Sequence, residues 1–313
     1  VFPSKETDAL VFSRFGAACK ICVAIYAVLS GYGYFFAREK TVRYGLKKSW
    51  GLLQIYWLQL FTLFIPAAVV GGWKITPWNL IVQMFGLLPN LNWFAWYVYF
   101  YIFCMLIMPL ICKAKVFRFK PKFNFVILLV VPYVLGIALR ILPIYEINTL
   151  IKDLASCFLY FSCFLVGYWM AENKVIEKSK DLKGAHNPLL NVLGIVVVFV
   201  ARVLIKSIAG FLLDVFYAPI LICLFVNLFE MITCKSFLLV LNILGKYSTG
   251  IWFFHAVFFS TYVSEWFQPV LKLVSWPPFM FVWLVLLSLV GAVVYQKVLD
   301  GLHASISFVK RKF

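Results

Sequence analysis

The stretch PPFMFVWLVLLSLVGAVVYQKVL, residues 277–299, carries a single charged residue, Lys297, close to its end. A helix crosses the hydrocarbon core of a membrane with about 20 mostly apolar residues, so this stretch predicts a membrane-spanning helix. The whole chain has the same character, with 64% hydrophobic residues, 13% charged residues and a mean hydropathy of +0.95. This composition is typical of an integral membrane protein and excludes a water-soluble globular domain.

Further apolar runs of similar length follow one another along the chain. They predict an all-α integral membrane protein, a multispan helical bundle with about nine transmembrane helices in a single domain, residues 1–313. Between the second and third runs, residues 75–92 contain prolines and asparagines and are expected to form a partly membrane-dipping lid. The runs lie at residues 15–37, 50–73, 93–112, 124–142, 152–171, 188–208, 211–232, 246–263 and 277–299.

The net charge of +17 comes from basic residues in short loops. Such residues report topology and do not indicate binding of nucleic acid, because basic loops of membrane proteins stay in the cytoplasm. We therefore expect loops 38–49, 113–122 and 172–187 and the carboxyl terminus to be cytoplasmic, in a multi-pass protein of the cell membrane, taken to be a bacterial cytoplasmic membrane. The basic residues on this side are Arg38, Lys40, Arg43, Lys47, Lys48, Lys113, Lys115, Arg118, Lys120, Lys122, Lys174, Lys178, Lys180, Lys183, Lys310, Arg311 and Lys312.

The chain begins with Val1, and its first residues lack the pattern of a secretory signal. An odd number of spans with a cytoplasmic carboxyl terminus places the amino terminus outside. We expect one further transmembrane helix upstream, which would give a full-length parent with about ten spans and both ends inside.

Most charged residues near the predicted spans are expected at the interfaces, where they can snorkel or cap. Cys19 and Cys22 form a C-x-x-C pair without a second pair, so packing is the expected role of the cysteines and no metal site is predicted. The charged residues interpreted as interfacial are Asp153, Asp214, Glu230, Asp300, Arg140, Arg202 and Lys206.

His255 is the histidine that lies within a predicted span, in LGKYSTGIWFFH, residues 244–255. With 3.6 residues per turn, Ser248, Trp252 and His255 share one helix face with Phe259, while Lys246 lies about half a turn away. Ser248 and His255 are about 10 Å apart along the axis, which excludes a bonded serine–histidine pair. Two interpretations stay open for His255: a hydrogen bond between helices, or chemistry.

A second polar group lies at residues 29–51. Ser30 and Gly31 close the first predicted helix, and glycine lets a backbone approach a ligand or a neighbouring helix. Arg43, Lys47 and Lys48 lie at the start of the next helix and could hold the phosphates of a coenzyme A thioester. The alternative is that the basic residues only fix topology, which is preferred for Arg38 and Lys40.

Four stretches together resemble the membrane-bound acyltransferase 3 family over nearly the whole chain. AIYAVLSGYG, residues 24–33, followed by VRYGLKKSWGLLQIYW, residues 42–57, is similar to the family's helix end with SG and its basic helix start. WFAWYVYFYIFCMLIMP, residues 93–109, and YFSCFLVGYWMAENK, residues 160–174, resemble two further family helices. LGKYSTGIWFFH resembles the family's late signature, which ends in histidine.

The resemblance implies a membrane-embedded acyltransferase. It would move an acyl group, commonly acetyl, from a cytoplasmic acyl-CoA such as acetyl-CoA to a hydroxyl group of a surface or exported saccharide or of a lipid-linked saccharide, with membrane lipids as surroundings. His255 would assist, and the principal base would lie in the upstream helix. The family's RxxR-type pair appears here as Lys47 and Lys48 after Arg43, which keeps the charge but gives up the bidentate fork.

Two other classes stay open. One is a transporter or flippase of lipid-linked saccharides, although no inverted repeat and no series of carboxylates across the spans is visible in the sequence. The other is an inactive membrane scaffold.

Overall fold

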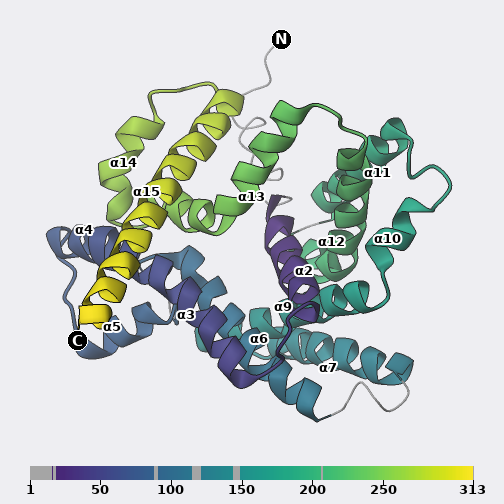
Figure 1. Ribbon diagram of the computed structural model, residues 1–313, viewed down its shortest axis with the longest axis horizontal. Coiled ribbons are helices and arrows are strands. Elements are labelled where there is room, and N and C mark those ends of the chain that lie inside the picture. Colours follow the sequence, from purple (N-terminus) through teal and green to yellow (C-terminus); the bar gives the residue numbers. More distant parts are fainter. Residues whose placement is uncertain are drawn as a thin grey trace. The chain divides into compact units, whose positions relative to one another are not determined.

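The structure is a computed structural model that describes Gly16 and residues 19–87, 91–114, 121–143, 149–205 and 207–312. The described residues form helices and no strands, which confirms the all-α fold (Figure 1). The chain divides into two compact units: the first contains residues 1–40 and 110–233, and the second contains residues 41–109 and 234–313. Residues 1–15 and loop residues 115–120, which the topology prediction includes, lie outside the described residues, as does Lys206, which was predicted to be interfacial.

Six helices of the described residues are long and apolar enough to cross a membrane, and three shorter helices are also apolar. Each of the predicted runs corresponds to one of these helices. The long ones are Val42–Val70, Trp96–Lys113, Leu150–Glu172, Leu212–Glu230, Lys235–Phe258 and Pro277–Ser307, and the shorter ones are Ile21–Phe35, Val126–Ile141 and Pro188–Leu204. The chain is therefore a multispan helical membrane protein.

The first unit is built on two helices that lie in direct backbone contact. Its elements are α2 (Ile21–Phe35), α7 (Pro121–Ile141), α9 (Thr149–Glu172), α10 (Val175–Lys180), α11 (Pro188–Leu204) and α12 (Ser207–Glu230). A Cβ atom added to Gly31 of α2 would lie 1.8 Å from the carbonyl oxygen of Phe164, and one added to Gly167 of α9 would lie 1.8 Å from that of Val28. Small residues of this kind allow membrane helices to pack at closest approach.

The carboxyl-terminal ends of α2, α9 and α12 meet at α10. Tyr32 donates to Glu177 at 3.4 Å, and Lys180 forms an ion pair with Glu230 at the end of α12. The Glu230 carboxylate raises the pKa of Lys180, whose side chain is half-buried and lies outside the spans. Since α9 leads directly into α10, all three helices run in the same direction. The topology prediction requires this arrangement, because each of these helices was expected to end on the cytoplasmic side.

A buried ion pair joins α11 to α12. The guanidinium of Arg202 donates to both carboxylate oxygens of Asp214, with Nε–Oδ1 and Nη2–Oδ2 distances of 2.6 Å and 2.7 Å. The residues are 7% and 1% exposed. The predicted interfacial role is therefore wrong for these two residues: they neutralise each other inside the hairpin, and neither reaches solvent by snorkelling.

The second unit has its core where α3 meets the end of α13. Its elements are α3 (Val42–Gln59), η1 (Leu60–Phe64), α4 (Ile65–Val70), α5 (Pro77–Met84), η2 (Trp93–Ala95), α13 (Lys235–His255), η4 (Ala256–Phe258), α14 (Val263–Leu271) and α15 (Pro277–Lys312). The helix α6 (Trp96–Lys113) starts in this unit, and its last turn is assigned to the first. Tyr56 packs on Phe253 with ring centroids 5.5 Å apart, and both belong to one buried apolar cluster.

The span that contains α3, η1 and α4 changes its pitch in the middle. Leu60–Phe64 form a π-helical turn, in which the Ile65 N–H donates to the Leu60 carbonyl five residues earlier. Pro66 follows directly, and a proline ring cannot follow a regular helical turn without a clash with the carbonyl four residues before it. The wider turn accommodates the proline, and π turns of this kind are frequent at functional sites.

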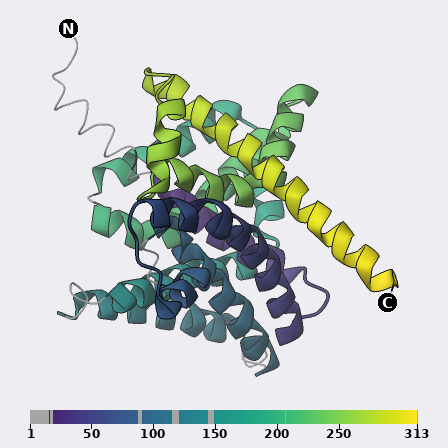
Figure 2. The ribbon, with the colours of Figure 1, turned by 90° about the vertical axis from the view of Figure 1, so that its left-hand side faces the viewer.

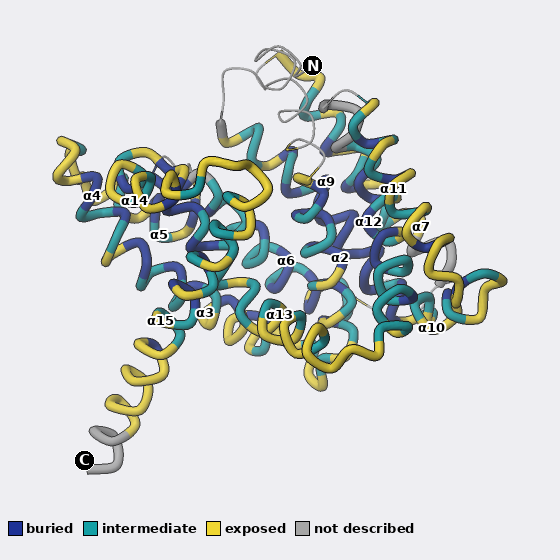
Figure 3. Tube along the Cα trace, turned by 90° about the horizontal axis from the view of Figure 1, so that it is seen from above, coloured by how far each residue is buried: buried dark blue, intermediate teal, exposed yellow. Residues whose placement is uncertain are grey.

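The helix α15 runs antiparallel to this span. Gln54 contacts His303 at 2.9 Å, and Thr62 contacts Tyr295 at 2.7 Å, so the residue numbers rise on one helix as they fall on the other. α15 has 36 residues, about 54 Å at 1.5 Å per residue, which exceeds a hydrocarbon core of about 30 Å. Figure 2 shows it as one continuous helix, and Figure 3 shows that its last described turns are exposed.

The predicted run 246–263 differs most from the structure. The helix begins at Lys235 and ends at His255, and the short η4 helix follows it. His255 is therefore the last residue of α13 and does not lie in the middle of a helix. The early start has a simple reason: Leu238, Leu239, Val240 and Leu241 already form an apolar surface, which the flanking Lys235 and Asn242 obscure in the sequence.

Candidate functional site

His255 lies at the point where α13 ends and the chain tightens into η4. Its Nδ1 atom forms a hydrogen bond with the backbone carbonyl oxygen of Trp252. A carbonyl oxygen can only accept, so Nδ1 carries the proton and Nε2 of the neutral ring keeps its lone pair. The helix end therefore holds an imidazole in the form that can accept a proton through Nε2.

Aromatic rings surround this imidazole. The ring centroid of Phe94 is 4.5 Å from that of His255 in an edge-on arrangement, and the centroids of Trp252 and Phe259 are 5.3 Å and 6.4 Å away. Phe94 also packs edge-on against Trp252 at 6.3 Å. These contacts fix the plane of the imidazole and limit the access of water to it, which strengthens any electrostatic interaction made there.

Phe94 is positioned by the segment that the sequence predicts to be a lid. Asn92 caps η2, and its Oδ1 atom accepts a hydrogen bond from the Phe94 N–H at 3.1 Å. Just before it, the Leu91 N–H donates to Oε1 of Gln83 at 3.4 Å. The Gln83 carbonyl in turn accepts from the Tyr56 hydroxyl at 2.6 Å. The described part of the predicted lid is thus tied to α3 and contributes buried residues to the core around His255.

The other predicted residues of α13 lie on the same helix as His255. Ser248 is half-buried, and so is Trp252, which supplies both the carbonyl and one ring of the surroundings of His255. Lys246 is exposed, with its Nζ atom 5.3 Å from the ring centroid of Tyr247. Ser248 and His255 belong to one continuous helix, so they are separated by about 10 Å along its axis, as predicted, and cannot form a bonded pair.

The predicted basic residues occupy the first turns of α3. This helix begins at Val42, where the Thr41 hydroxyl accepts a hydrogen bond from the Tyr44 N–H at 3.2 Å. Arg43, Lys47 and Lys48 are all exposed. The opposite side of the same turns is buried, because a Cβ atom on Gly45 would lie 2.1 Å from the Met105 carbonyl oxygen. The first turns of α3 thus present a cationic outer surface.

Ser30 and Gly31 belong to the first unit, whereas Arg43, Lys47 and Lys48 belong to the second. Ser30 is half-buried, and Gly31 lies at the contact between α2 and α9. Of the two roles that the sequence left open for Gly31, the structure favours the close approach of a neighbouring helix.

Lys40 has a more specific environment than its sequence context suggests. Its Nζ atom is 4.8 Å from the ring centroid of Phe35 and 5.3 Å from that of Tyr168, and it donates to the Tyr168 hydroxyl at 3.3 Å. The lysine thus ties the residues after α2 to the end of α9.

Sequence reasoning missed two polar residues of the second unit. Gln59 and Asn92 are both 0% exposed. Neither Gln59 amide atom, nor the Asn92 Nδ2 atom, has a hydrogen-bond partner among the described residues. An amide within an apolar run was a signal available for Gln59, since polar groups in spans are costly. Asn92 gave no such signal, because it stands in a polar connecting segment.

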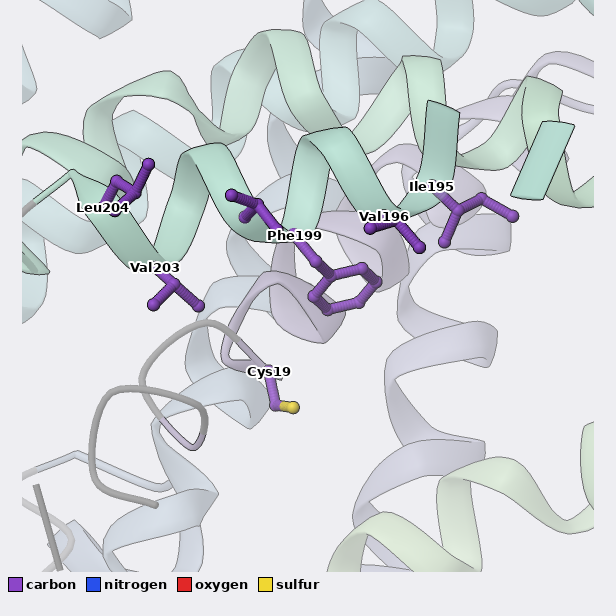
Figure 4. Close-up of a pocket in the computed structure, with 7 residues that line it drawn as sticks. Cys19, Ile195, Val196, Phe199, Val203 and Leu204 are labelled. Carbon is purple, nitrogen blue, oxygen red and sulfur yellow. The ribbon is translucent and has the colours of Figure 1, made fainter. Parts of the chain in front are cut away.

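A groove in the first unit has a different character. It encloses about 490 Å³ and is lined by apolar residues of α11, among them Phe199 and Val203, together with Cys19 (Figure 4). The described lining is apolar apart from the Cys19 thiol, and it suits a hydrocarbon chain. Cys19 and Cys22 are both free thiols, and within the described ranges no three His, Cys, Asp or Glu side chains gather as metal ligands.

A family model described as an acyltransferase domain, that of the acyltransferase 3 family, matches residues 2–296. No curated protein and no solved structure gives a significant match to the chain.

Proposed function

The chain belongs to the membrane-bound acyltransferase 3 family, and we propose from this premise that it transfers an acyl group from a cytoplasmic acyl-CoA to a hydroxyl group of a cell-surface or exported saccharide. Acetyl is the expected acyl group. That the protein is a membrane acyltransferase follows from the family and from the apolar helices. The thioester donor, the saccharide acceptor and the roles of single residues are our proposal.

The observation that carries the proposal is the state of His255. Its Nδ1 proton is held by the Trp252 carbonyl, so Nε2 can accept a proton from an acceptor hydroxyl or orient it. The surrounding rings of Phe94 and Trp252 keep the imidazole in place. A positioned neutral histidine in an apolar surrounding is suited to assist the attack of a hydroxyl group on an acyl carbon.

The donor's anionic end has a complementary surface on the same unit. Arg43, Lys47 and Lys48 are exposed on the first turns of α3, and Lys246 is exposed on α13. Phosphate groups bind Lys and Arg side chains through charge-assisted hydrogen bonds. In this proposal these residues attract the nucleotide part of the coenzyme, while the acyl end reaches His255.

The replacement His255→Asn tests the proposal, because asparagine keeps a hydrogen-bonding group but cannot exchange a proton near neutral pH. Acid–base assistance is worth about 10²- to 10⁴-fold in rate. The hydrogen bond from His255 to the Trp252 carbonyl lies within α13, and a typical intramolecular hydrogen bond contributes only about 0.5–1.5 kcal/mol to stability. We expect transfer, measured as release of the coenzyme A thiol in the presence of acceptor, to fall by this factor at nearly unchanged melting temperature.

His303→Asn is the matched control, since His303 lies on α15 of the same unit and contacts Gln54. It should transfer at the parental rate. A His255→Asn protein that transfers as fast as the parent would leave His255 with a packing role only.

A further inference from the structure

Asn92 uses only one half of its side-chain amide within the protein. Its Oδ1 atom caps η2 by accepting the Phe94 N–H at 3.1 Å. An N–H group requires an acceptor, so the atom that faces the Phe94 N–H is the amide oxygen. The other terminal atom of the side chain is therefore the NH₂ nitrogen, Nδ2. The side chain is 0% exposed, and its Nδ2 atom has no hydrogen-bond partner in the part of the chain that the structure describes.

A buried donor of this kind is costly. An unsatisfied amide removed from water costs about 1–3 kcal/mol on scales derived from protein mutations. Serine or aspartate at this position would cap the helix as well as asparagine does and would not bury an unpaired NH₂ group. The cap alone therefore does not explain the asparagine. The exposed Asn187 caps α11 in the same way, accepting from the N–H two residues later at 3.0 Å, with its NH₂ group near solvent.

Asn92 lies close in the chain to Phe94, a residue that contacts the imidazole of His255. The residue it caps, Phe94, has its ring 4.5 Å from that of His255. Leu91 and Ala95, on either side, belong to the same buried cluster as Phe253 and Val257, on either side of His255. The unpartnered donor therefore lies within the packed core that holds the imidazole.

We infer that the Asn92 NH₂ group donates a hydrogen bond to the carbonyl oxygen of the acyl group during transfer. This inference rests on the proposed function. A group that can only donate needs an oxygen acceptor, and in acyl transfer the carbonyl oxygen is the atom that gains negative charge. Asn92 is then a catalytic residue that acts beside His255.

The chemical step balances without any further reactant. The acceptor hydroxyl oxygen forms a bond with the acyl carbon, and the electron pair of the C=O double bond moves onto the carbonyl oxygen that faces Asn92. When the double bond re-forms, the carbon–sulfur bond breaks. The proton lost by the hydroxyl group leaves with the sulfur as the coenzyme A thiol. Asn92 neither gains nor loses a proton in this sequence.

Two replacements separate the donor from the cap. Asn92→Ser keeps an uncharged capping oxygen but is too short to place a donor where the amide nitrogen lies, and Asn92→Asp keeps the cap but has no NH₂ group. Loss of one donor to a developing oxyanion costs about 10²- to 10³-fold in kcat. We expect that loss in kcat, together with a rise of no more than about tenfold in the KM for the acyl donor, and a parental melting temperature for Asn92→Ser.

Binding of analogues gives a readout that a merely structural role would not change. A ketone analogue of the acyl-CoA keeps the carbonyl group without the scissile bond, and a thioether analogue lacks the carbonyl. Asn92→Ser should bind the ketone about tenfold more weakly than the parent, as expected for one hydrogen bond, and the thioether equally well. Asn187→Asp, the matched capping variant, should match the parent in every assay.

The outcomes distinguish the inference from the proposal beneath it. If Asn92→Ser keeps the parental kcat while His255→Asn loses transfer, Asn92 is only a cap and the proposed function stands. Equal weakening of ketone and thioether binding would also overturn the inference. A parent protein that transfers no acyl group from acyl-CoA would overturn the proposed function, and the role of Asn92 with it.

Discussion

At the scale of single residues, the absence of a side chain at Gly31 allows α2 and α9 to pack in direct backbone contact. A methyl group there would meet the Phe164 carbonyl at 1.8 Å, whereas a methyl group on Gly33 of the same helix would meet no atom within 4 Å. Two glycines separated by one residue in the same SGYG motif therefore have unequal roles: one is required by packing, and the other is not.

The replacement Gly31→Ala should force α2 and α9 apart and lower the free energy of unfolding by about 1–3 kcal/mol, the usual cost of overpacking. Gly33→Ala is the control, and it should leave stability unchanged or raise it by up to about 1 kcal/mol because alanine favours helix. Melting temperatures of the two variants in the same detergent provide the measurement. Equal melting temperatures would mean that the helices can separate at no cost.

The basic start of α3 can be tested in a similar way. Replacing Lys47 and Lys48 together by glutamine removes two charges that the structure leaves exposed, and each charge-assisted contact with phosphate is worth about 1.5–3 kcal/mol. We expect acyl-CoA binding, measured by titration, to weaken at least tenfold at parental stability. The double variant Lys178→Gln and Lys183→Gln makes the same change of charge in the first unit and should bind normally. Parental affinity in the Lys47 and Lys48 variant would reduce these lysines to topology signals.

At the scale of elements, the sequence predicted the helices better than their ends. Apolar runs are local, so every predicted run corresponds to an apolar helix. The ends of α13 were misplaced because polar residues such as Lys235 and Asn242 interrupt the apolar pattern without breaking the helix. The buried pair of Arg202 and Asp214 was missed for another reason: each residue alone resembles an interfacial charge, and only the hairpin brings them together.

The buried pair of Arg202 and Asp214 should be sensitive to the loss of one partner but tolerant of the replacement of both by apolar residues. Arg202→Met alone leaves the buried Asp214 carboxylate without its partner, which costs about 3–5 kcal/mol. Adding Asp214→Leu removes the remaining charge and should restore most of the lost stability, since apolar pairs often replace buried ion pairs without loss. Thermal melting of the single and double variants checks this. A double variant no more stable than the single one would show that the pair contributes through specific geometry and not through charge neutralisation.

At the scale of the whole molecule, the predicted topology leads to a labelling experiment. In the first unit α2, α9 and α12 end together at α10, as the positive-inside pattern requires. Single cysteines placed in loops 38–49, 113–122 and 172–187 of a cysteine-free protein should resist an impermeant thiol reagent in intact cells and react after lysis. A cysteine at Leu273, which is exposed between α14 and α15, is the control and should react in intact cells. Labelling of any of the three loops before lysis would contradict the topology.

The candidate site could be predicted only in part from the sequence. His255 stood out because a histidine in an apolar stretch is rare, and its helix neighbours Ser248 and Trp252 followed from periodicity alone. Phe94 could not be found in this way, because it contacts His255 from a distant part of the chain, and neither could Asn92, which caps the η2 turn that carries Phe94. Periodicity relates residues within one helix and carries no information on contacts between segments far apart in sequence.

The contact between α2 and α9 also limits where a substrate could pass through the protein. Backbone lies against backbone at both Gly31 and Gly167, one turn apart on each helix. Where a methyl group does not fit, neither an acyl chain nor a sugar can pass. A route that carries a substrate across the membrane therefore cannot pass between α2 and α9 at this turn.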